Sequence, residues 1–144
     1  MAKIIHSYWA YIVLITIIFA VVNTIIGLKS KKEFKDKDLR ISLFALIASH
    51  IQLIIGFIAY YTSSYYEMAR EVGMGEVMKS SDLRKILVEH PLVGIIAITL
   101  ITMGFSKHKK KTTDTAKFKT IAVFYGIALL LILSRLPWSQ WFSN

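Results

Sequence analysis

The sequence predicts an all-α integral membrane protein, folded as an antiparallel four-helix bundle with both termini on the outer, periplasmic side. Two observations carry this prediction. Four long apolar blocks alternate with charged segments, and basic residues are concentrated in two of the three connections. The 144 residues are 55% hydrophobic, above the share usual for a soluble domain. A run of about 18 apolar residues is long enough to cross the hydrocarbon core of a bilayer, so each block is a candidate span.

The four predicted spans cover residues 4–28, 41–61, 86–105 and 121–136, within a single membrane domain over residues 1–144. The blocks are continuous and lack the alternation of β-barrel strands. Backbone polar groups in lipid must be paired inside the segment, so helices are predicted. The first block is too long for a secretory signal and lacks a small-residue cleavage site, which favours a retained first span.

The charges of the connections predict the orientation. Residues 29–40 carry six basic and three acidic side chains, residues 106–119 carry six and one, and residues 62–89 carry four and five. The positive-inside rule therefore places the first and third connections in the cytoplasm of a bacterial inner membrane. Interfacial aromatic residues gather at the opposite ends of the spans: Tyr8, Trp9, Tyr11, Tyr60, Tyr61, Tyr65, Tyr66, Trp138 and Trp141.

The middle connection has a pattern of its own. Residues 65–72 and 81–88 are each predicted to form one or two helical turns. Ser81 and Asp82 offer a helix N-cap, so the third span is expected to begin outside the membrane. Pro91 is expected to kink that span just after His90.

His50, in the motif LIASHIQLIIG, is the leading candidate for a site residue. It lies about 14 Å from the inner end of its span at 1.5 Å per residue. An ionisable residue at that depth is costly, and we expect it to face the interior of the bundle with a functional role. The alternative is a neutral histidine that bonds to a neighbouring helix, as Ser49 and Gln52 are also able to do.

His90, in VEHPL, and His6, at the start of the first span, are the other histidines within reach of the membrane. Gly94 and Ala97 share a helical stripe with His90 and leave room for a flat macrocycle or for close helix packing. Histidines from facing helices can hold haem iron axially. The preferred axial ligands, and the only predicted metal ligands, are His50 and His90, with His6 as the substitute. On straight helices His50 and His90 differ in depth by about 10 Å, which tilt or the kink would have to close.

Four further residues carry specific expectations. Arg135 either extends its charge to the membrane surface or pairs with a haem propionate or with Glu89 at the same depth. His108, in SKHKKK, is expected to be a solvated loop residue. Asn23 and Tyr125 are expected to form hydrogen bonds between helices.

The sequence excludes several chemistries. There is no cysteine, hence no thiolate ligand and no covalent haem attachment. No H-E-x-x-H motif, Gly-rich phosphate loop or serine elbow is present. Enzymatic activity therefore stays uncertain, and an electron-transfer or accessory subunit is favoured over a stand-alone enzyme. The net charge of +9 has no accompanying aromatic-basic motif, which argues against nucleic acid as a partner.

Five segments resemble a family of small bacterial four-span membrane proteins described as cytochrome b-like: HSYWAY, DLRISLFALIASHIQLIIG, VEHPL, ITMGFSKHKK and KFKTIAVFYGIALLLILSRLPW. The resemblance covers almost the whole chain and includes the motifs around His6, His50 and His90. It implies a four-helix bundle with membrane-embedded histidines and haem b. There is a looser similarity to four-span, haem-binding protoporphyrinogen oxidases. The lysine that those enzymes use within a span has no counterpart here, so their activity is not expected.

The predicted function is that of a small b-type haem-binding membrane protein, embedded in the lipid bilayer, which transfers electrons between quinol and a membrane-protein partner or a second copy. The rival is a cofactor-free structural or assembly subunit of a larger membrane complex, supported by the compact size and the aromatic outer rim. Metal or proton transport has less support, because three spans would have to bring their histidines to one depth.

Overall fold

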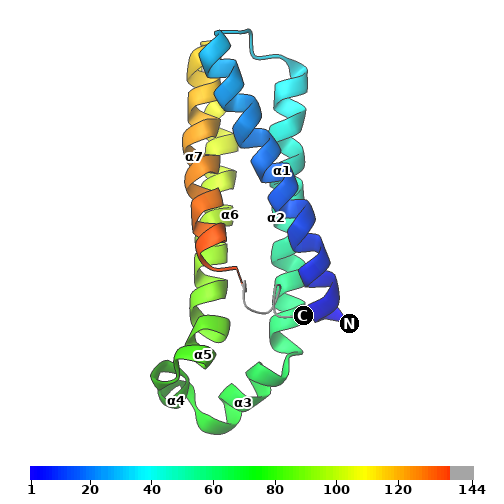
Figure 1. Ribbon diagram of the computed structural model, residues 1–144, viewed down its shortest axis with the longest axis vertical. Coiled ribbons are helices and arrows are strands. Elements are labelled where there is room, and N and C mark those ends of the chain that lie inside the picture. The colour runs from blue at the N-terminus through cyan, green and yellow to red at the C-terminus, as the bar shows by residue number, and fades with distance from the viewer. Residues whose placement is uncertain (137–144) are drawn as a thin grey trace.

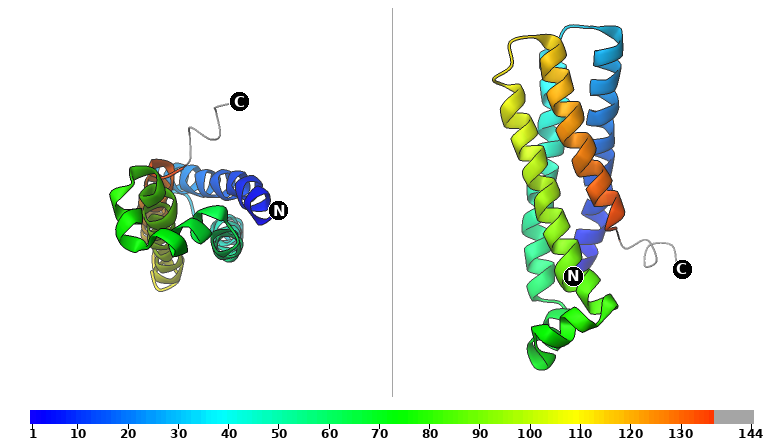
Figure 2. Two further views of the ribbon diagram at one scale, coloured as in Figure 1. Left: turned by 90° about the horizontal axis from the view of Figure 1, so that it is seen from below. Right: turned by 90° about the vertical axis from the view of Figure 1, so that its left-hand side faces the viewer.

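Four long helical segments lie side by side in the computed structural model, which describes residues 1–136 (Figures 1 and 2). They are α1 (Ala2–Ser30), α2 (Asp36–Tyr61), the continuous segment Ser81–His108, and α7 (Asp114–Ser134). Of the described residues, 88% are helical and none forms a strand, which confirms the all-α class. Each of the four segments is long and apolar enough to cross a membrane.

The third long segment consists of three parts: α5 (Ser81–Arg84), a π-helical turn (Lys85–Glu89) and α6 (His90–His108). The short helices α3 (Ser64–Val72) and α4 (Met74–Lys79) connect it to α2. These short helices and the start of α1 lie at one end of the molecule, which we call the cap end (Figure 1). The connections 31–35 and 109–113 lie at the opposite end, which we call the loop end.

The helices extend beyond most of the predicted apolar limits. The second begins at Asp36 and the third at Ser81, each five residues before the predicted span. The cap of the third is Ser80 and not Ser81 as expected, because Ser80 has the extended backbone of an N-cap and its side chain accepts from the Leu83 amide at 3.3 Å. The fourth helix ends at Ser134, two residues before the predicted limit. Trp138 and Trp141 lie outside the described residues.

Small residues line the contacts between the long helices. Ala20, Ala45, Ala97 and Ala128 are fully buried, whereas large apolar side chains such as those of Ile15 and Leu130 point outward. Small residues let helix backbones approach closely in a membrane, where outward apolar side chains meet lipid instead of water. Larger side chains such as those of Ile17, Ile101 and Tyr125 are buried between the helices as well. The many apolar side chains that point outward support a bilayer environment.

Two glycines permit the tightest of these approaches. A Cβ atom at Gly27 of α1 would lie 2.5 Å from the Phe118 ring of α7, and one at Gly104 of α6 would lie 2.5 Å from the Cβ of Phe124. Nearby, the Tyr125 hydroxyl donates to the Ser42 carbonyl across the helix contact at 2.8 Å. The expected interhelical role of Tyr125 is therefore confirmed.

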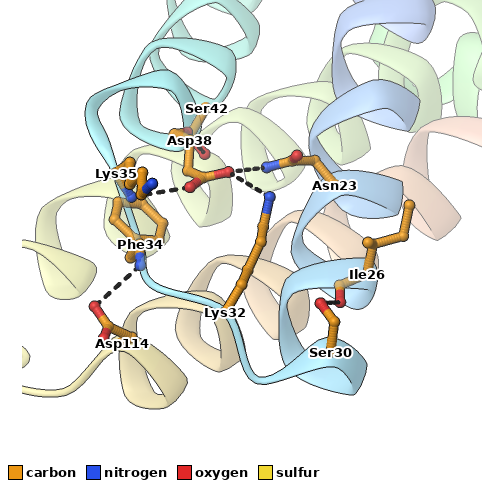
Figure 3. A network of polar contacts seen from close by, with 9 residues as sticks. All are labelled: Asn23, Ile26, Ser30, Lys32, Phe34, Lys35, Asp38, Ser42 and Asp114. Carbon is orange, nitrogen blue, oxygen red and sulfur yellow. Dashed lines mark hydrogen bonds and ion pairs between the residues drawn. The ribbon is translucent and has the colours of Figure 1, made fainter.

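A buried carboxylate ties the loop end together (Figure 3). Asp38 is 2% exposed, and its Oδ1 accepts from Asn23 Nδ2 at 2.8 Å while Oδ2 accepts from the Lys35 amide at 2.9 Å. The Lys32 ammonium lies 3.4 Å from Oδ1. This cluster joins α1, the first connection and α2, and it confirms the interhelical bond expected of Asn23. From the sequence, Asp38 is counted only as one of the three acidic residues in a basic connection, and its burial is not predicted.

Candidate functional site

His50 lies on the exposed surface of the four long helices, where α2 meets α6. Its Nε2 is 2.9 Å from Thr102 Oγ1, and that hydroxyl already donates to the Ile98 carbonyl, so the imidazole N–H is the donor. The expectation that His50 faces the interior is wrong. Ala48 and Ser49 occupy the buried face instead, and one residue further along a helix turns the next side chain outward by about 100°.

The preferred ligand pair is not brought together. His50 contacts Thr102, which follows His90 by twelve residues on α6, or about 18 Å along the helix axis at 1.5 Å per residue. Two imidazoles on one metal ion must lie within a few ångströms of each other. His50 and His90 therefore do not share a site in this structure.

The structure does bring His6 and His90 together. The two rings, from the first turns of α1 and of α6, have centroids 6.1 Å apart and planes at 90°. Both residues are partly buried and lie at the cap end. The substitute ligand of the sequence-based prediction is thus the one that faces His90.

A backbone carbonyl holds the His90 ring. Its Nδ1 lies 2.9 Å from the carbonyl oxygen of Arg135, just after α7. A carbonyl only accepts, so Nδ1 carries the proton and the neutral ring keeps its lone pair on Nε2. Histidines that bind metals are commonly oriented in this way, because the bond fixes both the tautomer and the ring.

Two buried polar atoms beside His6 have no hydrogen-bond partner. They are Nδ1 of His6 and Oε1 of Gln52 on α2, although the Gln52 amide nitrogen donates to the His6 carbonyl at 2.9 Å. The His6 ring packs against Gly56, where an added Cβ would come within 3.2 Å of Cε1. Unpaired buried polar atoms cost free energy and are uncommon. Here the two belong to neighbouring side chains, since His6 also interacts with the Gln52 side chain.

The π-helical turn directly before His90 is stabilised from α2. Pro91 has no amide hydrogen, so the Leu87 carbonyl lacks the donor that an α-helix would supply four residues later. The Tyr60 hydroxyl takes that place at 2.9 Å. The kink expected at Pro91 thus coincides with a wide turn, a feature that often occurs at functional sites.

Glu89 lies between two arginines next to the histidine pair. Its Oε2 is 2.9 Å from Arg84 Nε, and its Oε1 is 3.7 Å from Arg135 Nε. The Glu89 pairing proposed for Arg135 is therefore present. The cluster carries one positive charge more than negative, which leaves it suited to a second acidic group.

His108 is buried, which corrects the expectation of a solvated loop residue. It is 2% exposed, its ring packs beside Phe34 and Phe105, and its Nδ1 donates to the Phe105 carbonyl. The helix α6 runs to His108 instead of ending near Phe105, and this extension turns the ring inward beneath the first connection. The lysines around His108 in the sequence are typical of an exposed loop and do not indicate that the ring is buried.

Neither of two hollows in the described chain includes the histidine pair. One is lined by Glu67, Arg70 and Glu71 of α3, and the other lies at the loop end beside His108. Within residues 1–136, no group of three or more His, Cys, Asp or Glu side chains is placed to hold a metal ion. His6 and His90 are thus two facing imidazoles with no third such side chain beside them in the described residues.

No protein family, curated protein or solved structure matches this chain. The fold and the site therefore define a class only: an α-helical protein with four helices able to span a membrane, which carries a facing histidine pair at one end.

Proposed function

We propose that this chain is a small b-type haem-binding membrane protein in which His6 and His90 are the axial ligands. One observation carries the proposal, the 6.1 Å between their ring centroids. A metal ion between two imidazoles lies about 2 Å from each ligating nitrogen, which places ring centres on opposite sides of it about 6 Å apart. The observed separation matches that requirement.

The surrounding residues fit the same group. His90 has Nε2 free for a ligand. Nδ1 of His6 is buried against Gly56 of α2, so Nε2 is the His6 nitrogen left for a ligand. A Cβ at Gly94, one turn after His90, would meet nothing within 4 Å, so that side of α6 is open to a flat ligand. Arg135 is the proposed partner of a haem propionate. Its guanidinium shares the Glu89 carboxylate with Arg84, so some of its N–H donors are available for a second carboxylate.

Bound haem b supplies reversible one-electron transfer. The chain orients the two imidazoles, holds a positive charge beside them and surrounds them with apolar helices. The proposed topology is an antiparallel bundle in a bacterial inner membrane, with the loop end cytoplasmic and both termini outside. The basic charge of residues 29–40 and 106–119 supports that orientation. The pair then lies near the outer face, where a quinol or a membrane-protein partner would exchange electrons.

A second candidate is a cofactor-free structural or assembly subunit. It is favoured by the location of the two hollows, neither of which is lined by His6 or His90. A ligand site of macrocycle size is normally a preformed concavity. Haem binding at this pair would need a shift of side chains or helices, and a structural role would not.

Absorption spectra of the purified protein separate the two candidates. The protein from haem-replete cells is compared, oxidised and then reduced, with the variants His6→Ala and His90→Ala. We expect a Soret band from the unaltered protein and its loss in both variants, while His50→Ala, the matched control, keeps it. A folded protein without a Soret band would support the structural candidate. A band lost only in His50→Ala would refute the proposed ligand pair.

A further inference from the structure

The loop end holds a hollow of about 310 Å³ with a basic lining, far from the histidine pair. Three lysines line it, Lys35, Lys109 and Lys117, against one carboxylate, Asp36. Phe34, Leu39 and His108 complete the wall. The lining therefore combines an excess of positive charge with an apolar edge.

Aromatic rings hold two of these ammonium groups in place. Lys109 Nζ lies 4.6 Å from the centre of the Phe105 ring, and Lys117 Nζ lies 5.7 Å from that of Phe34. Such cation–π contacts restrict long side chains that would otherwise be mobile. His108 donates its Nδ1–H to the Phe105 carbonyl, so the ring adds an apolar face to the wall and the lysines are the groups that attract an anion.

We propose that this hollow binds the phosphate of an anionic phospholipid headgroup. The lining residues come from the two connections and from the ends of α2, α6 and α7 beside them, where helices of this length leave the hydrocarbon. Basic pockets between helices at the membrane surface are suited to phosphate headgroups, which lysine binds as a point charge.

The apolar surface next to the hollow fits the rest of the lipid. Phe44 and Ile47 follow Asp36 on α2 at helical spacing, and both are well exposed. Acyl chains attached to a phosphate in the hollow would lie along this face of α2. The proposal is independent of haem, because none of these residues contacts His6 or His90.

Native mass spectrometry of the full chain in detergent tests the proposal. The protein is titrated with phosphatidylglycerol and with zwitterionic phosphatidylcholine, and the Lys109→Gln, Lys117→Gln double variant is measured alongside. The control is Lys110→Gln with Lys111→Gln, which removes the same amount of charge at the same end of the molecule but outside the hollow. We expect a preference for phosphatidylglycerol that falls about tenfold in the first double variant and less than about twofold in the control.

Three results would overturn the proposal. Equal losses in the two double variants would mean that diffuse charge, and not the hollow, attracts the lipid. Equal binding of both lipids by the unaltered protein would exclude anion recognition. Complete displacement of the lipid by soluble glycerol phosphate would assign the hollow to a free phosphate. Circular dichroism of each variant verifies that the helices are intact.

Discussion

The two ends of the molecule differ in whether their buried polar groups have hydrogen-bond partners. At the loop end, both oxygens of Asp38 accept hydrogen bonds and a lysine lies alongside. At the cap end, His6 Nδ1 and Gln52 Oε1 are buried without partners. A polar cluster whose hydrogen bonds are all made stabilises a fold. Buried polar atoms without partners cost free energy, and they occur more often at functional sites. The loop end is therefore expected to stabilise the protein, and the cap end is where the proposed binding site lies.

The contacts at glycines also differ between the two ends. Gly27 lets the Phe118 ring press directly on α1, and that ring is fully buried. At the cap end, a Cβ atom at Gly56 would come within 3.2 Å of the His6 ring, which is also a close approach, whereas one at Gly94 would meet nothing within 4 Å. The closest glycine contacts therefore lie at Gly27 and Gly104, whereas the space beside Gly94, one turn after His90, is open.

Breaking the polar cluster should give the largest loss of stability. Asp38→Ala leaves the Asn23 amide and the Lys35 amide without their acceptor, and we expect the free energy of unfolding to fall by about 3 kcal/mol. Thermal unfolding in detergent micelles measures the change. Asp36→Ala, an exposed carboxylate in the same helical turn, is the control and should cost less than about 1 kcal/mol. Equal losses would show that the cluster has no special role.

The second-largest loss of stability is expected when a side chain is added at the close helix contact of the loop end. Gly27→Ala places a Cβ atom 2.5 Å from the Phe118 ring, and we expect a loss of about 2 kcal/mol from overpacking. Gly126→Ala on α7 meets nothing within 4 Å and should be neutral or slightly stabilising. The same unfolding measurement applies, and a neutral Gly27→Ala would disprove the tight contact.

A smaller effect is expected at the turn that positions His90. Tyr60→Phe removes the hydroxyl that donates to the Leu87 carbonyl, and the stability should fall by about 1 kcal/mol. Tyr61→Phe, whose side chain is exposed, should change it little. If the turn also orients the ligand, the Soret band of Tyr60→Phe should weaken while that of Tyr61→Phe stays unchanged. Identical spectra and stabilities for the two would exclude this role of Tyr60.

The smallest change in stability is expected at the histidine pair, His6 and His90. In haem-free protein, His6→Leu removes an unpaired buried nitrogen, so the free energy of unfolding should change by less than about 0.5 kcal/mol. A loss comparable to that of Asp38→Ala would mean that His6 supports the fold. The contrast between the two ends would then be wrong.

The sequence by itself determined the class and several contacts. Long apolar runs dictate membrane-length helices, because the backbone in lipid has to pair internally. Polar groups within those runs also need partners, and this reasoning correctly anticipated the bonds of Asn23 and Tyr125. The ion pair of Arg135 with Glu89 was one of the alternatives that it left open. These are requirements of composition and depth, which a linear pattern contains.

Only the tertiary structure decided which side chains face each other. The outward direction of His50 and the burial of His108 depend on the rotation of each helix against its neighbours. When a helix is apolar on all sides, no amphipathic stripe reveals that rotation. The approach of His6 to His90 depends in addition on the π-helical turn before Pro91 and on helix tilt. Those are set by packing between segments distant in sequence, which no local pattern encodes.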